Sequence, residues 1–120
     1  MDNNTIDDSK IKIFYSLVIP CYNESENLVN LIERCEYILK QKEDIEVILV
    51  DNGSTDDTDE ILTNILINIP KERLRLVRIK KNQGYGNGIL VGLNKCKGEI
   101  LGWTHADLQT DPTDFLRAIS

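Results

Sequence analysis

The hydrophobic positions of this chain follow two alternating patterns. Short continuous apolar runs predict strands buried on both faces, because such strands need an apolar side chain at every position. These runs span 11–20, 45–50, 74–79 and 100–104. Between them, apolar residues recur every three or four positions, as on the buried face of a helix. This second pattern predicts helices over 28–41, 61–69 and 89–97.

Residues that end or begin helices support these boundaries. Pro70 closes the second predicted helix, and Gly98 is placed for a left-handed C-cap after the third. Asp111 followed by Pro112 resembles an N-cap with proline at the first helical position, so a further helix is expected there.

Strand and helix alternate over the whole chain, and this alternation predicts the fold class. Parallel strands joined by helices need helices on both faces, so we expect an α/β open sheet within a single domain, 13–120, after a flexible N-terminus, 1–12. In such sheets ligands bind beyond the carboxyl ends of the strands. The loops that follow the strands would therefore line one rim; they are 20–27, 51–56, 82–88 and 105–111.

Composition narrows the function classes. The chain has 120 residues, of which 41% are hydrophobic, and a formal net charge of −6, which argues against a nucleic-acid groove. The basic segment 71–81 alternates with apolar residues and is interpreted as an outer strand with one solvated side, in preference to a patch for anionic lipid.

The cysteines and the N-terminus bear on the compartment. Cys21, Cys35 and Cys96 are odd in number and widely spaced, which fits neither a disulfide framework nor a zinc site. The first twelve residues lack the pattern of a secretory leader, and no apolar run has the length of a membrane span. We expect a cytoplasmic chain in a reducing compartment.

The last predicted strand ends in a cluster of chemically active side chains. His105, Asp107 and Gln109 are spaced by two, so in an extended segment they face one side, whereas Ala106 and Leu108 face the other. Carboxylates and an imidazole can hold a divalent cation whose remaining positions are filled by water and substrate phosphate.

Each candidate at the rim has a structural alternative. Asp107 and Asp111 are equally well explained as turn and cap residues, and Asp51 before Asn-Gly fits either a turn aspartate or an exposed ligand for a base or ribose. Glu24 could hold a ribose diol or favour the positive end of the next helix. Trp103 is expected in the core rather than as a platform for a sugar.

Other chemistries are not supported. The glycines of 82–88 could approach a phosphate, but they lack the dinucleotide spacing, and no Walker loop is present. Tyr22 and Tyr85 could stack on a base or shield the cleft. The cysteines have no histidine partner nearby, and no nucleophile elbow supports Ser-His-Asp hydrolysis. A receiver-type signalling domain would need an acidic pair after the first strand, which is missing.

Four segments together, 16–24, 47–56, 82–88 and 105–109, resemble the nucleotide-sugar-binding half of family 2 glycosyltransferases with the GT-A fold. The order and spacing of the four are more specific than any one of them. The wording Ala-Asp-Leu-Gln at 106–109 is most similar to the branch that transfers a sugar to a polyprenyl phosphate, the dolichol-phosphate mannose synthase type.

The resemblance implies a role for matching residues. The loop after the first strand would cradle the nucleoside, the end of the second strand would read the base, and the glycine loop would close over the nucleotide. Asp107 matches the second acid of the family's Asp-x-Asp metal motif, whereas His105 replaces the first acid and suits Mn²⁺ better than Mg²⁺. The implied nucleotide-sugar-binding residues are Pro20, Tyr22, Glu24, Asp51, Asn52, Gly84, Gly88, Ala106 and Gln109.

The resemblance also implies an activity. The expected donor is a UDP- or GDP-sugar, the cofactor Mn²⁺ or Mg²⁺, and the reaction an inverting transfer to a polyprenyl phosphate or a glycan. We expect the acceptor part and any general base beyond Ser120, and no catalytic base is assigned within this chain. The alternative is a non-catalytic module that binds a nucleotide sugar or a partner. Membrane association through later residues and self-association stay open.

Overall fold

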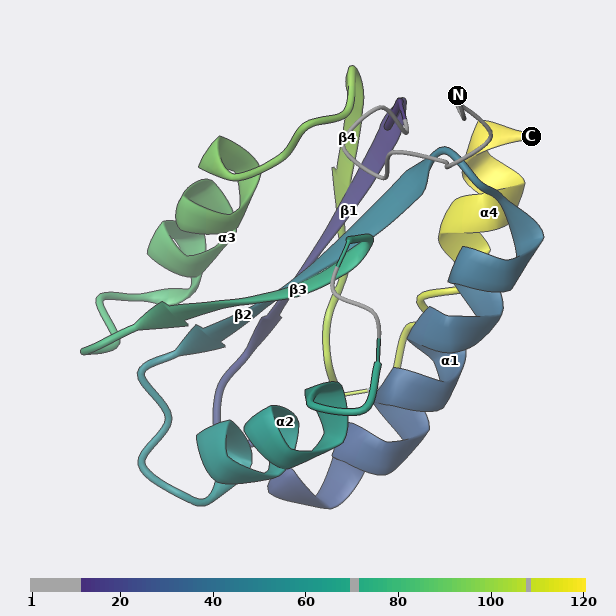
Figure 1. Cartoon of the computed structure of the whole chain (residues 1–120). Coiled ribbons are helices and arrows are strands. Elements are labelled where there is room, and N and C mark those ends of the chain that lie inside the picture. The colour runs from purple at the N-terminus through teal and green to yellow at the C-terminus, as the bar shows by residue number, and fades with distance from the viewer. Residues whose placement is uncertain (1–11, 70–71, 108) are drawn as a thin grey trace, which may run out of the picture.

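The computed structural model describes residues 12–69, 72–107 and 109–120 and contains one four-stranded parallel sheet. The strands are β1 (Tyr15–Cys21), β2 (Ile45–Asn52), β3 (Leu74–Ile79) and β4 (Ile100–Trp103), in the spatial order β3-β2-β1-β4 (Figure 1). Tyr15 of β1 pairs with Ile45 of β2 and with Ile100 of β4. The central strands therefore run in register, and the loops that follow them emerge at one edge of the sheet.

Helices cover both faces of this sheet, as the alternating pattern predicted. The helices are α1 (Leu28–Gln41), α2 (Thr58–Leu66), α3 (Tyr85–Asn94) and α4 (Asp114–Ile119), with a short 3₁₀ turn (Ser25–Asn27) before α1. Figure 1 shows α3 on one side of the sheet and the other three helices on the opposite side. The larger core joins alternate β1 and β2 residues to α1, α2 and α4, and the smaller core joins Val18, Ile48 and Val50 to α3.

The outer strand β4 corrects two expectations. Its apolar run predicted a buried strand, but Ile100, Leu101 and Trp103 are 42%, 45% and 48% exposed. The reason is position, since β4 pairs with β1 on one side and with no other strand of the described part. Trp103 is therefore not a core residue, and the exposed apolar side chains keep self-association as a prediction.

Several boundaries differ from the sequence pattern. The helix expected over 89–97 instead spans Tyr85–Asn94. It begins earlier because Gly86 and Gly88, which were expected in the preceding loop, form its first turn. Gly98 does not form a left-handed cap; it approaches β1 closely, and its amide donates to Ser16 Oγ at 2.9 Å. Helix α4 begins at Asp114, two residues after the expected proline. The expectations for 1–11, Pro70, Lys71 and Leu108 lie outside the described residues.

Close packing of α3 on the sheet depends on Gly92. A methyl group at this position would overlap Val18 and lie 2.9 Å from a methyl carbon of Val50, both in the buried core. We expect Gly92→Ala to destabilise the fold by about 1–2 kcal/mol, because overpacking exceeds the gain in helix propensity. Urea unfolding measures the loss. The matched control is Gly86→Ala in the same helix, where nothing lies within 4 Å and no loss is expected; equal stability of both variants would contradict the packing argument.

The basic segment forms an outer strand, as expected, but its arginines have structural partners. The Arg73 guanidinium donates to the carbonyls of Leu39, Lys42 and Ile45, which ties the start of β3 to the end of α1. Arg78 pairs with Asp59 of α2 at 2.6 Å. These partners occupy the guanidinium groups of Arg73 and Arg78.

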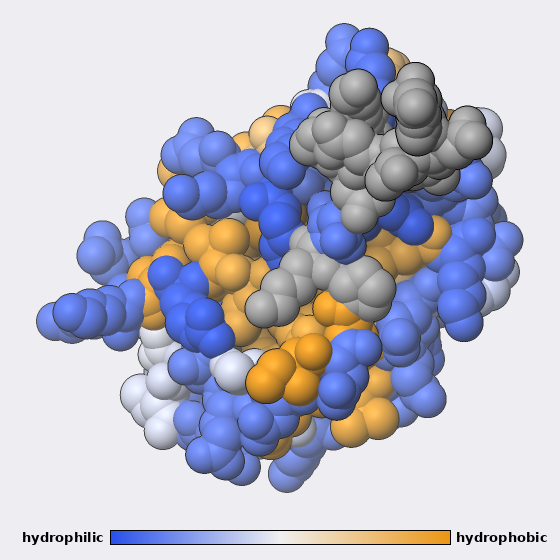
Figure 2. All heavy atoms as spheres, in the orientation of Figure 1, coloured by the Kyte–Doolittle hydropathy of each residue, from blue (hydrophilic) through white to orange (hydrophobic). Residues whose placement is uncertain are grey.

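Beside this strand, apolar side chains reach the surface at the end of α2 (Figure 2). They belong to a groove of about 470 Å³ between α2 and β3, lined by Thr63, Leu66, Ile67, Leu74, Arg75, Leu76 and Arg78.

The cysteines are free, and no membrane-crossing helix is found among the described residues. Cys21 and Cys35 are buried and Cys96 is partly buried. Burial is the largest cause that raises the pKa of Cys35, to about 12, so its thiol stays protonated. None of the helices in 12–69, 72–107 and 109–120 combines the length and the apolar character that a crossing requires.

Candidate functional site

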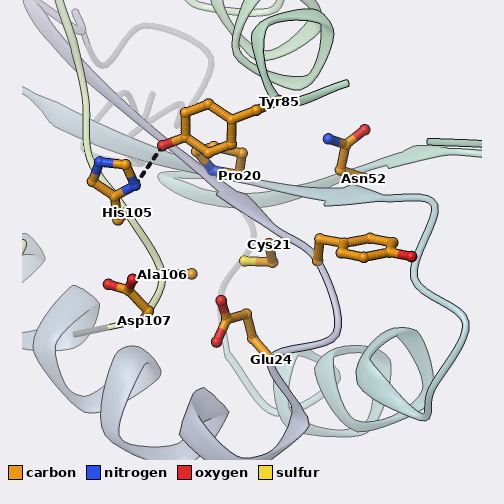
Figure 3. Close-up of a pocket in the computed structure, with 9 residues that line it drawn as sticks. Pro20, Cys21, Glu24, Asn52, Tyr85, His105, Ala106 and Asp107 are labelled. Atoms are coloured by element: carbon orange, nitrogen blue, oxygen red, sulfur yellow. Dashed lines mark hydrogen bonds between the residues drawn. The ribbon is translucent and has the colours of Figure 1, made fainter. Parts of the chain in front are cut away.

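A cavity of about 170 Å³ lies at the carboxyl ends of β1, β2 and β4, between the loops that follow β1 and β4 (Figure 3). The first residue of α3 completes its wall. In Figure 3 Tyr85 and His105 lie on one side of the cavity, whereas Glu24 and Asp107 lie on the other. The lining residues are Pro20, Cys21, Tyr22, Glu24, Asn52, Tyr85, His105, Ala106 and Asp107.

The loop after β1 is held in place by Asn23, which the sequence analysis did not single out. Asn23 adopts a positive φ of 51°, a conformation that asparagine tolerates better than most residues. Its Oδ1 accepts the amides of Thr55 at 2.8 Å and Asp56 at 3.2 Å. The next amide, that of Glu24, donates to Thr58 Oγ1 at 3.0 Å. These bonds join the β1 and β2 loops into one rigid wall.

Asn52, at the end of β2, presents an unsatisfied polar atom. Its side chain is 1% exposed, and its Nδ2 donates to the Gly84 carbonyl at 3.1 Å. Its Oδ1 is buried and has no hydrogen-bond partner among the described residues. Such an orphaned acceptor is costly unless a ligand or water donates to it. Gly88 packs directly against this amide, since a methyl group there would lie 2.8 Å from Asn52 Nδ2.

Asp51 differs from the expectation of an exposed carboxylate. It is 5% exposed, and its Oδ1 accepts the amide of Ser54 at 3.2 Å. The burial arises because Asp51 is still within β2, paired with Cys21 of β1 and Arg78 of β3. The turn interpretation of Asp51 therefore describes its contacts.

An aromatic cluster links the α3 and β4 loops. Tyr85 Oη lies 2.8 Å from His105 Nδ1, and the two rings stack at 5.3 Å with an interplanar angle of 11°. Trp103 packs edge-on against both rings. Burial and then the charge of Asp107 raise the pKa of Tyr85, which keeps its hydroxyl protonated. Tyr85 was considered from the sequence, but its contact with His105 was not.

The loop after β4 alternates as expected. His105 and Asp107 are exposed, whereas Ala106 between them is 3% exposed and anchors the loop in the core. Asp107 Oδ1 accepts a hydrogen bond from the Gln109 amide at 3.1 Å. The Asp107 carboxylate therefore both stabilises this turn and lines the cavity. Gln109 itself is exposed and does not line the cavity.

Asp111 is structural. It accepts the amide and the hydroxyl of Thr113 at 2.9 and 2.8 Å and pairs with Arg34 of α1 at 2.8 Å. Burial raises its pKa, but the hydrogen bonds from Thr113 and the contact with Arg34 outweigh burial and lower it. Asp111 therefore fixes the loop between β4 and α4 to α1, and it does not line the cavity.

The described side chains can hold a divalent metal only in part. No three His, Cys, Asp or Glu side chains gather closely enough within 12–69, 72–107 and 109–120 to form a complete metal site. Asp107 faces the cavity with free carboxylate capacity, and Glu24 lies on the same side of the cavity (Figure 3). One or two carboxylates with phosphate and water is an ordinary shell for Mg²⁺ or Mn²⁺, so the donor set fits a metal bound together with a phosphate ligand.

The predicted site residues divide into two groups. Most line the cavity, because they end strands at the same edge. Four do not: Asp51 and Gly88 lie behind the wall, and Gly84 and Gln109 lie outside it. Gly84 is the N-cap of α3 and takes a φ of 108°, a conformation that glycine adopts readily. A glycine at this position therefore permits the backbone turn into α3.

Comparisons with known proteins identify the family and the fold. The sequence model of the family "Glycosyl transferase family 2" matches residues 16–120. The undecaprenyl-phosphate 4-deoxy-4-formamido-L-arabinose transferase of Yersinia enterocolitica is 39% identical over 106 residues, which are 88% of this chain and 32% of that protein. The transferase of the same name from Pseudomonas fluorescens is 34% identical, over 89% of this chain and 32% of its own length. The chain thus spans about a third of these curated relatives.

Solved structures are similar over most of the chain. The mannosyltransferase PcManGT from Pyrobaculum calidifontis, in complex with GDP-Man and Mn²⁺, has a TM-score of 0.70 and 25% identity, covering 87% of this chain and 30% of that one. TarS from S. aureus in complex with UDP has a TM-score of 0.61 and 25% identity, covering 79% of this chain and 28% of that one.

Proposed function

This chain belongs to glycosyl transferase family 2, and from that premise we propose that its cavity binds the nucleoside diphosphate of a UDP- or GDP-sugar. The observation that carries the proposal is the meeting of Glu24 and Asp107, from the loops after β1 and β4, with Asn52 at the end of β2, in one cavity at the carboxyl edge of a parallel sheet. The structures of similar proteins with GDP-Man and with UDP support the same ligand class.

The polar groups of the cavity suit different parts of such a ligand. Asn52 holds the wall of the cavity, because its Nδ2 donates to the Gly84 carbonyl before α3, and in Figure 3 its Oδ1 is directed away from the other labelled side chains. The Glu24 carboxylate can accept from ribose hydroxyls, and Pro20 and Tyr22 form an apolar wall for the base. The remaining predicted residues do not contact the ligand in this proposal. They hold the neighbouring loops and side chains in place, and they are Asp51, Gly84, Gly88 and Gln109.

Asp107 is the residue we assign to the divalent metal. A bound metal of this kind neutralises charge that develops on a departing diphosphate. The complex of the mannosyltransferase with Mn²⁺ supports a divalent metal in this fold. Asp107 is also oriented by its own turn, since the Gln109 amide occupies one lone pair of Oδ1 and fixes the carboxylate plane.

In the whole protein we propose an inverting transfer of the sugar to a polyprenyl phosphate. A phosphate oxygen of the acceptor attacks the anomeric carbon, and the bond from that carbon to the nucleoside diphosphate breaks with its electron pair leaving on the diphosphate. A phosphate acceptor is already ionised at neutral pH and needs no general base. The curated relatives are named as undecaprenyl-phosphate transferases, and these names support a polyprenyl phosphate acceptor over a glycan hydroxyl.

Calorimetric titration of the purified chain with UDP, GDP and their sugar conjugates tests the donor site. One nucleotide is expected to bind, more tightly with Mn²⁺ or Mg²⁺ than with a chelator. Asn52→Ala is expected to weaken that binding about tenfold, because the hydrogen bond that holds the Gly84 carbonyl and the start of α3 beside the cavity is lost.

Asn64→Ala, at an exposed position of α2, is the matched control and should bind as the unaltered chain does. Failure of the folded chain to bind either nucleotide under all metal conditions would contradict the proposal. Turnover by the whole protein separates the transferase from a binding module: addition of polyprenyl phosphate should release nucleoside diphosphate from a transferase and leave the donor intact in a module.

A further inference from the structure

We infer that His105 is a hydrogen-bond donor to the diphosphate of the nucleotide rather than a metal ligand, and that Tyr85 is the positioning residue that gives it this role. The inference rests on the proposed nucleotide site and assigns the recognition of its phosphates. It also gives His105 and Asp107 different roles, because Asp107 contacts the metal whereas His105 contacts the phosphate.

The Tyr85 side chain fixes the His105 ring on three counts. Its hydroxyl lies 2.8 Å from Nδ1, its ring stacks on the imidazole at 5.3 Å, and Trp103 packs edge-on against both. In Figure 3 the His105 ring is directed toward Tyr85, and the Asp107 carboxylate lies farther from Tyr85 along the same loop. The imidazole is therefore held in one orientation, although it is exposed.

The direction of the Tyr85–His105 hydrogen bond follows from the chemistry of the two groups. A phenol O–H is a stronger donor than an imidazole N–H, and an imidazole nitrogen is a stronger acceptor than a phenol oxygen. The favoured arrangement has the Tyr85 hydroxyl donating to Nδ1. A neutral imidazole that accepts at Nδ1 carries its proton on Nε2.

An imidazole in this tautomer binds a metal through Nε2 only after its proton moves to Nδ1, which reverses the hydrogen bond with Tyr85. The Nδ1 lone pair is occupied by the Tyr85 hydroxyl, and Nε2 carries a proton instead of a lone pair. An Nε2–H group instead matches an acceptor, and beside Asp107 the acceptor brought by a metal-bound nucleotide is a phosphate oxygen.

Nuclear magnetic resonance of the free chain tests the tautomer. His105 is the single histidine of the sequence, so its ring nitrogens give unambiguous signals in long-range ¹H–¹⁵N spectra. We expect Nε2 protonated and Nδ1 unprotonated, and we expect Tyr85→Phe to shift this pattern toward a mixture of tautomers. Tyr37→Phe, exposed on α1, is the matched control and should leave the signals unchanged. A proton on Nδ1 with a bare Nε2 would overturn the inference.

Binding measurements test the role. With UDP or GDP, whichever binds, His105→Ala is expected to weaken nucleotide affinity about tenfold, and His105→Gln, which keeps an N–H donor, to recover part of the loss. The affinity for Mn²⁺ at saturating nucleotide, followed by electron paramagnetic resonance, should change less than about twofold in His105→Ala. Binding of uridine or guanosine, which carry no phosphate, should not change.

The outcomes separate this inference from the proposed function. Loss of Mn²⁺ affinity in His105→Ala, with nucleotide still bound, would make His105 a metal ligand and overturn the inference while leaving the donor site intact. A loss confined to sugar conjugates would move the contact from the phosphate to the sugar and overturn it as well. An unaltered chain that binds neither nucleotide would overturn the donor site itself, and with it the role of His105.

Discussion

Replacing Asp107 with asparagine is expected to abolish the metal dependence of nucleotide binding and to weaken the affinity for Mn²⁺ by about a hundredfold or more. The physical reason is charge, since Asp107 is the carboxylate that faces the cavity from the metal-motif loop. Asparagine keeps an oxygen that can accept the Gln109 amide, so the turn is preserved while the anionic ligand is lost. Titration of Mn²⁺ with UDP or GDP present measures the change.

The control for this variant is Glu60→Gln, which removes a carboxylate from an exposed position of α2 far along the chain from the motif. It should bind metal and nucleotide as the unaltered chain does. Residual binding of Asp107→Asn in the presence of a chelator should equal that of the unaltered chain under the same condition. If Asp107→Asn kept full metal dependence, the metal would be held elsewhere and the assignment of Asp107 would be wrong.

Replacing Glu46 with alanine is expected to destabilise the fold by about 3 kcal/mol. Glu46 is fully buried in β2, inside an apolar run, and its Oε2 accepts the Ser16 hydroxyl at 2.7 Å and the Lys97 amide at 2.6 Å. Its Oε1 accepts from Arg75 at 2.8 Å. Removing the carboxylate leaves these donors unsatisfied, and it releases the connection from α3 to β4 from the sheet.

The same carboxylate predicts a dependence of stability on pH. Burial would raise the pKa of Glu46, but hydrogen bonds from Lys97, Ser16 and Arg75, together with the Arg75 charge, outweigh burial and lower it. A lowered pKa in the folded state stabilises the protein above the unfolded value, near 4.3, and this contribution is lost as the pH falls through the folded value. Acid should therefore destabilise the unaltered chain below about pH 4.3 more steeply than it destabilises Glu46→Ala.

Urea unfolding followed by circular dichroism, repeated between neutral and acidic pH, measures both effects. Glu43→Ala, at an exposed position before β2, is the control and should change the free energy of unfolding by less than about 0.5 kcal/mol. A Glu46→Ala variant as stable as this control, or one with the full acid dependence of the unaltered chain, would contradict the network.

The site was predictable as far as it depends on strand ends. Glu24, Asn52 and Asp107 each follow an apolar run, and parallel strands bring their carboxyl ends to one edge, so the three meet in the cavity. The burial of Asp51 has the same source, because β2 runs two residues beyond the predicted 45–50 and so keeps this side chain in the sheet rather than at the rim. A period of two cannot locate a strand end to a single residue.

The contacts between loops could not be read from the sequence. Asn23 reaches across to the β2 loop, Asn52 to the start of α3, and Tyr85 to His105. Each pair is separated by many residues along the chain, and nothing in either local pattern indicates its partner. Glu46 shows the same limit, since its single charge within an apolar run gave no sign of the Ser16, Lys97 and Arg75 groups that satisfy it.

By itself, the sequence determined the number and kind of elements, the parallel sheet with helices on both faces, and the edge at which the polar loops gather. The kind of each element follows from the periodicity of its apolar residues, which is a local property of the sequence. The parallel direction of the strands follows from the helices that connect them. Only the tertiary structure decided that β4 is an outer strand with Trp103 exposed, that Asp51 is buried, and that Tyr85 orients His105. Burial and side-chain partners depend on which elements become neighbours, and that is set by packing across the whole domain.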